Sequence, residues 1–292
     1  MNKTLYIVTV LLFCFYNMKA QENDLIVTDQ NQRDSEFVVG AIDGSVNVSG
    51  LGGATYSVPI HVPEGLGGIQ PNLSIGYNNQ SGNGLLGWCW DLQGISSITR
   101  LGTTLYHDSI MSGVDFINDR FALDGQRLIC VSGNYGMNGA EYRTEIDGMS
   151  KIVSYSGNGA NGPVYFKVWL PNGNIAYYGN TPDSRVMLQQ NDGVCIWLLN
   201  KIEDRNGNYM TYSYNQGGSS YTLSQINYGC NDSANIISTY HVSFYYSSRV
   251  DAEKSFIGNI GAVIGFYILG MYCYEFFTDR FMPLMKQVLY FL

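Results

Sequence analysis

The sequence predicts an all-β fold of antiparallel strands and hairpins, arranged as a sandwich, a barrel or a segment of a curved shell. Between residues 38 and 250, tyrosine, valine and isoleucine alternate with polar residues in many short runs, as they do in half-buried strands. Asn-Gly and Asp-Gly dipeptides, which favour tight turns, separate these runs. No stretch in this range keeps a helical apolar period.

The composition supports this fold class. The chain has 292 residues, of which 45% are hydrophobic and only 14% are charged, well below the roughly 25% charged residues of an average soluble domain. Such a chain can bury a large core, and low charge with abundant glycine and tyrosine is typical of exported β-rich proteins. The formal net charge of −8 argues against a nucleic-acid partner, which requires a basic surface.

The N-terminus predicts export. Lys3 supplies a basic start, Leu5 to Tyr16 form an apolar segment, and Ala20 suits a cleavage site. We therefore expect a signal peptide over residues 1–20 and a secreted or cell-surface protein. A lipoprotein acylated at Cys14 is the alternative. Residues 21–37 are polar and unpatterned, and we expect a flexible leader there.

The stretch from Gly67 to Arg100 is the densest in β and turn signals. Pro71 suits the first residue of a strand because it cannot donate to a ladder, and a strand is predicted over Asn72–Tyr77. Asn83-Gly84 predicts the centre of a type I′ hairpin turn. A second alternating run covers Ile95–Leu101.

Two tryptophans follow that turn. Trp88 and Trp90 are two residues apart, so on one strand they would face the same side. Such a pair could form a sugar-binding platform. The alternative is core or interface packing, because aromatic side chains bury the most area per residue.

Further strands are expected along the rest of the domain, to about residue 250. They are Ser45–Val48, Ala54–Val62, Arg120–Leu123, Arg127–Val131, Lys151–Tyr155, Tyr165–Leu170, Ile175–Tyr178, Val194–Ile202, Tyr209–Tyr214, Tyr221–Ile226 and Thr239–Tyr246.

Residues 251–292 form an apolar tail of a different character. Ser255 to Tyr274 is uncharged and nearly long enough to span a bilayer as a helix, and Gly261 and Gly265 make a GxxxG pattern. A buried pair of strands is the alternative. Membrane contact is expected only through this tail.

No pattern predicts catalysis, a metal site or a cofactor. His61, His107 and His241 stand alone, without a metal-ligand spacing. Glu141, Arg143 and Glu145 would share one face of a strand, which suits a surface ion-pair ladder. The cysteines after the signal peptide lack a CxxC motif, and we expect them to be free thiols: Cys89, Cys130, Cys195, Cys230 and Cys273.

Residues 58–100 (VPIHVPEGLGGIQPNLSIGYNNQSGNGLLGWCWDLQGISSITR) resemble the opening of the virulence-plasmid B-protein (SpvB-type) N-terminal domain. This domain also begins insecticidal toxin-complex B components and many bacterial Rhs/YD-repeat proteins. Further matching segments are DRFALDGQRLI, EYRTEIDG, YFKVWLPNGNIAYYG and WLLNKIEDRNGNYMTYSY. The structural signature residues are Pro71, Gly76, Tyr77, Gly82, Asn83, Gly84, Gly87, Trp88, Trp90 and Arg100, with Asn206 and Gly207 at a later turn. Cys89 stands where the family usually has glycine.

The resemblance implies a non-enzymatic structural domain, covering residues 38–250, of a secreted, toxin-related Rhs/YD-repeat protein. Its partners would be other segments or subunits of a toxin or Rhs shell. Family members continue far beyond this length, so the resemblance also predicts a truncated gene product. The alternative function is a carbohydrate-binding module that uses Trp88 and Trp90.

Overall fold

The computed structural model describes residues 44–156, 162–187, 193–217, 220–238, 240–248, 253–255, 262–264 and 267–275. The chain divides into two units, Met1–Ile42 and Asp43–Leu292, and all described residues belong to the second. The predicted signal peptide, the leader and the last residues of the tail lie outside the described residues.

The prediction of an all-β fold is confirmed. The described residues form three antiparallel sheets, and the single α-helix among them is α2 (Leu105–Asp108). The other helical elements in the described residues are three short 3-10 helices: η1 (Leu66–Gly68), η2 (Pro182–Ser184) and η3 (Asp232–Ala234).

The first sheet has six strands in the order β1-β2-β3-β6-β5-β4. They are β1 (Ser45–Val48), β2 (Ala54–Ile60), β3 (Leu73–Asn78), β4 (Asn83–Gly84), β5 (Gly87–Trp88) and β6 (Trp90–Gln93). Leu73 and Ile75 of β3 and Leu92 of β6 are buried on one face of this sheet. This apolar face therefore attaches the sheet to the core.

The second sheet has thirteen strands and contains most of the domain. Its strands are β7 (Ser97–Leu101), β8 (Arg120–Leu123), β9 (Gln126–Ser132), β10 (Glu141–Thr144), β11 (Lys151–Tyr155), β12 (Tyr165–Trp169), β13 (Ile175–Tyr178), β14 (Arg185–Met187), β15 (Val194–Glu203), β16 (Asn208–Gly217), β17 (Ser220–Asn231), β18 (Tyr240–Ser248) and β21 (Tyr267–Glu275). A separate hairpin joins β19 (Glu253–Ser255) and β20 (Ala262–Ile264).

Part of this sheet closes into a barrel. Strands β7 to β13 pair successively, each antiparallel to the next. Strand β15 then pairs with β13 through Tyr177 and Lys201, and with β7 through Ile98 and Trp197. Eight strands, β7 to β13 and β15, thus form a closed up-and-down barrel, in which no strand of the ring is left as an edge.

Aromatic side chains fill the barrel. The Trp197 ring lies 5.3 Å from the ring of Phe121 and 5.1 Å from that of Phe166, both edge-to-face. The Trp197 indole nitrogen donates to the Pro163 carbonyl at 3.0 Å, so its polar atom is satisfied. An eight-stranded barrel is just wide enough for side chains to fill it or for one small ligand, and here the rings of Trp197, Phe121 and Phe166 occupy it as a packed core.

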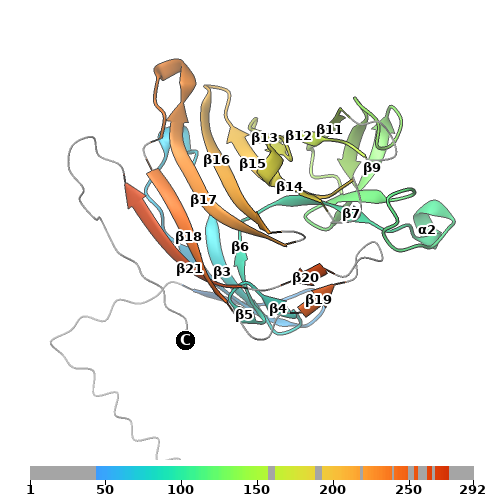
Figure 1. Cartoon of the computed structure of the whole chain (residues 1–292), viewed down its shortest axis with the longest axis horizontal. Helices are drawn as coiled ribbons and strands as arrows, with labels where there is room; N and C mark the ends of the chain where they lie inside the picture. Colours follow the sequence, from blue (N-terminus) through green and yellow to red (C-terminus); the bar gives the residue numbers. More distant parts are fainter. Residues whose placement is uncertain are drawn as a thin grey trace, which may run out of the picture. The chain divides into compact units, whose positions relative to one another are not determined.

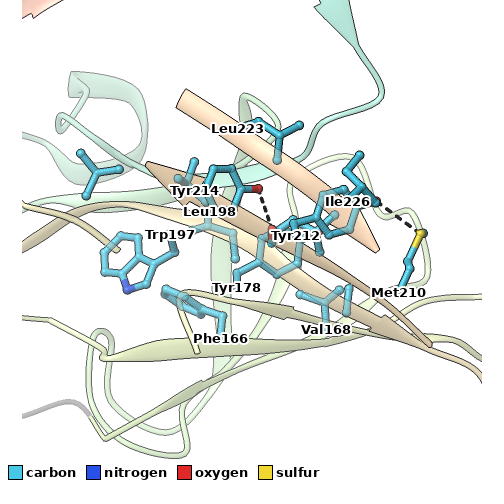
Figure 2. Packing of buried hydrophobic residues seen from close by; sticks show 14 of the residues in the cluster. Phe166, Val168, Tyr178, Trp197, Leu198, Met210, Tyr212, Tyr214, Leu223 and Ile226 are labelled. Atoms are coloured by element: carbon cyan, nitrogen blue, oxygen red, sulfur yellow. Dashed lines mark hydrogen bonds between the residues drawn. The ribbon is translucent and has the colours of Figure 1, made fainter. Parts of the chain in front are cut away.

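The remaining strands extend from the barrel as an open sheet, in the order β15-β16-β17-β18-β21 (Figure 1). Their buried side chains join those of the barrel and of the six-stranded sheet in one hydrophobic cluster. Figure 2 shows the junction, where barrel residues meet residues of the open sheet: Phe166, Val168, Tyr178, Trp197, Leu198, Met210, Tyr212, Tyr214, Leu223 and Ile226.

Close approach of the chain to Trp197 requires a glycine at position 179. Gly179 has a φ of 73°, and a β-carbon there would lie 2.4 Å from an indole carbon of Trp197. The backbone of Gly179 also donates to the carbonyl of Leu198 at 2.9 Å. Glycine is thus needed both for the left-handed conformation and for the contact with the ring.

Several predicted strands coincide with observed ones. Ser45–Val48, Arg120–Leu123, Lys151–Tyr155 and Ile175–Tyr178 have the predicted bounds. The membrane-spanning helix considered for the tail is wrong for the described residues, because β21 is a strand paired along its whole length with β18. Within the described parts of the chain, no helix has the length and apolar character needed to cross a membrane.

The barrel core yields the first prediction. Replacing Trp197 by alanine removes the ring that Phe121 and Phe166 pack against, and should lower the free energy of unfolding by about 3–5 kcal/mol. Urea denaturation followed by circular dichroism measures this loss. The matched control is Trp88→Ala, because Trp88 is 67% exposed and should change stability little. Equal losses in the two variants would contradict the packing described here.

Candidate functional site

The Gly67–Arg100 stretch contributes to both large sheets. Tyr77 and Gly76 lie in β3; Pro71, expected as the first residue of this strand, is buried two residues before its start at Leu73. The Asn83-Gly84 prediction is wrong: these residues form β4 and pair with β5, and the hairpin turn is Leu85-Leu86. The local dipeptide favours a turn, but neither residue has a positive φ here, because pairing with Gly87–Trp88 extends the backbone.

The two tryptophans do not share a strand. Trp88 belongs to β5 and Trp90 to β6, and Cys89 between them adopts a left-handed φ of 66°. Cys89 is buried, its N–H donates to the carbonyl of Gly82, and its Sγ lies 3.2 Å from the Ser81 carbonyl oxygen. Glycine would adopt this φ without strain, whereas residues with a side chain, such as cysteine, rarely do so.

Trp90 takes part in an aromatic row, whereas Trp88 is exposed. Trp90 pairs across the sheet with Tyr77, their ring centroids 5.1 Å apart, and lies edge-on to Tyr56 at 6.4 Å. Trp88 pairs with Asn83 of the short hairpin. The predicted flat platform of two tryptophans on one strand is therefore not formed.

The later turn meets the opening stretch. Gly207, with a φ of 79°, turns the chain between β15 and β16, and Asp204 accepts hydrogen bonds from the N–H groups of Asn206 and Asn208. A β-carbon on Gly67 would lie 2.7 Å from the side-chain nitrogen of Asn208. The opening stretch and the Asn206-Gly207 turn are thus in contact, which their distance in sequence could not indicate.

Arg100 is the centre of a buried polar cluster at the barrel. Its side chain is only 3% exposed and the side chain of its partner Asp119 only 1%, with 3.2 Å between Nη1 and Oδ2. Arg100 Nε also donates to the carbonyl of Val194 at 2.7 Å, and the guanidinium carbon lies 4.4 Å from the ring centroid of Phe116. Asp119 accepts from the N–H groups of Asp115 and Phe116.

Burial governs the ionisation of this cluster. It lowers the pKa of Arg100 from its ordinary value, although Asp119 opposes the change. Burial raises the pKa of Asp119, against its hydrogen bonds with Asp115, Phe116 and Arg100. Burial also raises the pKa of the adjacent Cys195 thiol to about 11, so this free thiol stays protonated at neutral pH.

A second polar cluster anchors α2. Asp108 is 5% exposed and accepts from Arg120 Nε at 2.8 Å, from Arg127 Nη2 and from the N–H of Thr104. His107 Nε2 lies 2.9 Å from Glu145 Oε1. Sequence reasoning missed this cluster, because Asp108, Arg120 and Arg127 come from separate elements and share no motif.

The acidic cluster around Arg143 forms only part of the predicted ladder. Arg143 and Lys151 both pair with Glu141, at 3.0 and 2.7 Å. Glu145 lies past the end of β10 and pairs with His107 instead, because the strand stops at Thr144. In the described residues, no three His, Cys, Asp or Glu side chains are grouped as metal ligands.

Large apolar side chains are exposed on two neighbouring loops. Tyr106 is 89% exposed and Met111 78% exposed on the loop that contains α2. Met149 is 82% exposed on the connection between β10 and β11, and the His107–Glu145 pair joins the two loops. We call this surface the apolar patch; its members are Leu105, Tyr106, Ile110, Met111, Ile146 and Met149. Exposed apolar surface of this kind is a common feature of protein interaction sites.

The fold is one found in toxin-complex proteins. The crystal structure of TcdB2-TccC3 superposes with a TM-score of 0.63 at 16% identity, over 80% of this chain and 14% of that chain. The Photorhabdus luminescens Tc holotoxin pore (TccC3-D651A mutant) gives 0.65 at 15% identity, over 86% and 14%. This chain therefore spans about a seventh of the length of these proteins.

The chain belongs to the SpvB family. The family described as Salmonella virulence plasmid 65kDa B protein matches residues 48–260. The N-terminal domain of the effector protein SpvB from Salmonella typhimurium strain LT2 has a TM-score of 0.59 at 16% identity, over 76% of this chain and 88% of that chain. No curated protein matches the sequence.

The Arg100–Asp119 pair yields a prediction about stability. Asp119→Leu leaves the Arg100 charge buried without its carboxylate and should cost about 3–5 kcal/mol. The double variant Arg100→Met/Asp119→Leu removes both charges and should regain most of that loss. Urea denaturation of wild type and the two variants measures both effects.

The half-exposed pair Lys201–Glu203, 3.0 Å apart, provides the control. Glu203→Gln should cost no more than about 1 kcal/mol, as surface pairs do. If Asp119→Leu were as mild as Glu203→Gln, the buried pair would not hold the barrel end in place.

Asp108 yields a prediction about pH. Burial raises the pKa of Asp108, but the Thr104 N–H and the two arginines outweigh it, so the pKa lies below its ordinary value. A depressed carboxyl pKa stabilises the folded state above the unfolded pKa of about 3.9, and this contribution is lost as the pH falls through the folded value.

Asp108→Asn should therefore be less stable than wild type at pH 7, and the difference should shrink below about pH 4. Urea midpoints at several pH values measure this. The control is Asp147→Asn, an exposed carboxyl on the β10–β11 connection. A stability difference for Asp108→Asn that does not change with pH would refute this assignment.

Proposed function

We propose that this chain is a non-catalytic structural domain of a secreted, toxin-related Rhs/YD-repeat protein, and that it forms part of the wall of a larger shell. Membership of the SpvB family and the fold shared with TcdB2-TccC3 support this role. In this proposal the predicted signal peptide over residues 1–20 directs the protein out of the cell.

The observation that carries the proposal is the filled barrel. A ligand bound inside a barrel needs a cavity there, but Trp197, Phe121, Phe166 and Tyr142 are buried against one another inside this barrel. The side chains of Arg100 and Asp119 bond to each other and to backbone groups. The functional surfaces are then on the outside.

Two outer features suit association with other segments of a shell. The apolar patch presents Tyr106, Met111 and Met149 to solvent. Strand β21 pairs with β18, and the described residues contain no second strand partner for it. An edge strand can extend a sheet by accepting a further strand. We therefore propose other segments or subunits of the same toxin-related assembly as partners.

The apolar patch yields a testable prediction. The full chain should co-purify with the polypeptides encoded next to it when they are expressed together. The triple variant Leu105→Ser/Met111→Ser/Met149→Ser should lose this association, because it removes exposed apolar area without touching the barrel core. Pull-down followed by size-exclusion chromatography measures complex formation, and the melting temperature verifies the fold.

Ile237→Ser provides the matched control, because Ile237 is 87% exposed and lies outside the apolar patch. It should leave the complex intact. A complex that survives the triple variant would refute the role of the apolar patch, and the absence of any complex for wild type would refute the structural proposal itself.

A further inference from the structure

The outer face of the barrel over β11, β12 and β13 carries a regular array of aromatic and cationic side chains. Tyr155 pairs with Tyr165, Lys151 pairs with Trp169, and Lys167 pairs with Tyr177. Their neighbours in sequence, such as Phe166 and Val168, are buried in the barrel. Because side chains alternate along a strand, the array faces outward. We call Tyr155, Tyr165, Lys167, Trp169 and Tyr177 the outer aromatic face.

The rings of this face are held in defined positions. Tyr155 and Tyr165 are stacked, with centroids 4.8 Å apart and planes 5° from parallel. Lys167 Nζ lies 4.8 Å from the Trp169 ring centroid and 5.3 Å from that of Tyr177. Each of these side chains is only partly buried. The strand ladder thus presents a set of rings with an ammonium group between two of them.

One lysine of the outer aromatic face, Lys167, can still form an ion pair with a ligand. Lys151 pairs with Glu141 at 2.7 Å, and Lys201, on the neighbouring strand β15, pairs with Glu203 at 3.0 Å. Lys167 has no carboxylate partner in the described parts of the chain. Lys167 therefore places an ammonium group beside two rings, where the carboxylate of a ligand can pair with it.

We propose that the outer aromatic face binds an acidic polysaccharide. The apolar C–H face of a sugar ring packs on Trp169, Tyr177 and the Tyr155–Tyr165 pair, and a carboxylate of the polymer pairs with Lys167. A single available cation suits a polymer with sparse charge. Single-stranded nucleic acid has a charge on every phosphate and requires a basic groove, which this acidic protein lacks. This activity is independent of the wall role.

The test uses the full chain and hyaluronan, which carries one carboxylate per disaccharide. Isothermal titration calorimetry should detect binding that weakens with salt, and neutral dextran should bind much more weakly. Trp169→Ala should reduce the affinity about tenfold and Lys167→Met about fivefold, the latter keeping the aliphatic stem that packs on the rings.

Two control variants lie outside the outer aromatic face. Trp88→Ala removes the exposed tryptophan of β5, and Arg185→Gln removes a half-buried cation of β14. Both should change the affinity for hyaluronan less than about twofold. Near-ultraviolet circular dichroism and melting temperature verify that each variant is folded; should Trp169→Ala unfold, Lys167→Met and Tyr177→Leu give the same comparison.

Each remaining outcome overturns the proposal. Absence of binding to hyaluronan excludes an acidic-sugar site of this kind. Equal binding of dextran, or an unchanged affinity in Lys167→Met, excludes the role of the charge. Tighter binding of a single-stranded oligothymidylate would show that the face recognises nucleic acid, and loss of binding in Trp88→Ala alone would place the sugar site on β5.

Discussion

The closure of the barrel through β15 is the constraint on which the rest of the structure depends. This one strand pairs with β7 and with β13, and it also continues into the open sheet through β16. The Arg100 side chain of β7 also donates to the carbonyl of Val194, the first residue of β15, which is 94 positions further along the chain. If any one strand is missing from the ring, two neighbouring strands are left with unpaired edges. Closure therefore orders every strand of the barrel at once.

Closure also explains the use of aromatic and small residues around Trp197. The barrel has limited internal volume, which rings from β8, β12 and β15 fill in edge-to-face contacts. Gly179 then has to be small, because the backbone passes directly against the Trp197 ring. At the barrel end, Arg100 brings a charge into this apolar environment, and Asp119 offsets its desolvation. The barrel thus depends both on the close packing around Trp197 and on the pairing of Arg100 with Asp119.

The local signals in the sequence were a good guide to strands and a poor guide to turns in one region. Period-two alternation identified strands such as Lys151–Tyr155 and Ile175–Tyr178 because it reflects which face of a strand is buried. The Asn83-Gly84 turn was wrong because pairing with β5 extends both residues. Trp88 and Trp90 were assigned to one strand because nothing in their neighbours indicates the left-handed backbone at Cys89.

The sequence alone determined the all-β class, the approximate positions of many of the strands and, through the Gly67–Arg100 stretch, the SpvB family. These follow from side-chain alternation and from turn and motif residues, which are local properties. Only the tertiary structure decided that β15 closes a barrel, that Asp119 is the partner of Arg100, and that Asp108 holds two arginines. Such contacts join segments far apart in the chain, and a local pattern carries no information about which distant strand or charge it will meet.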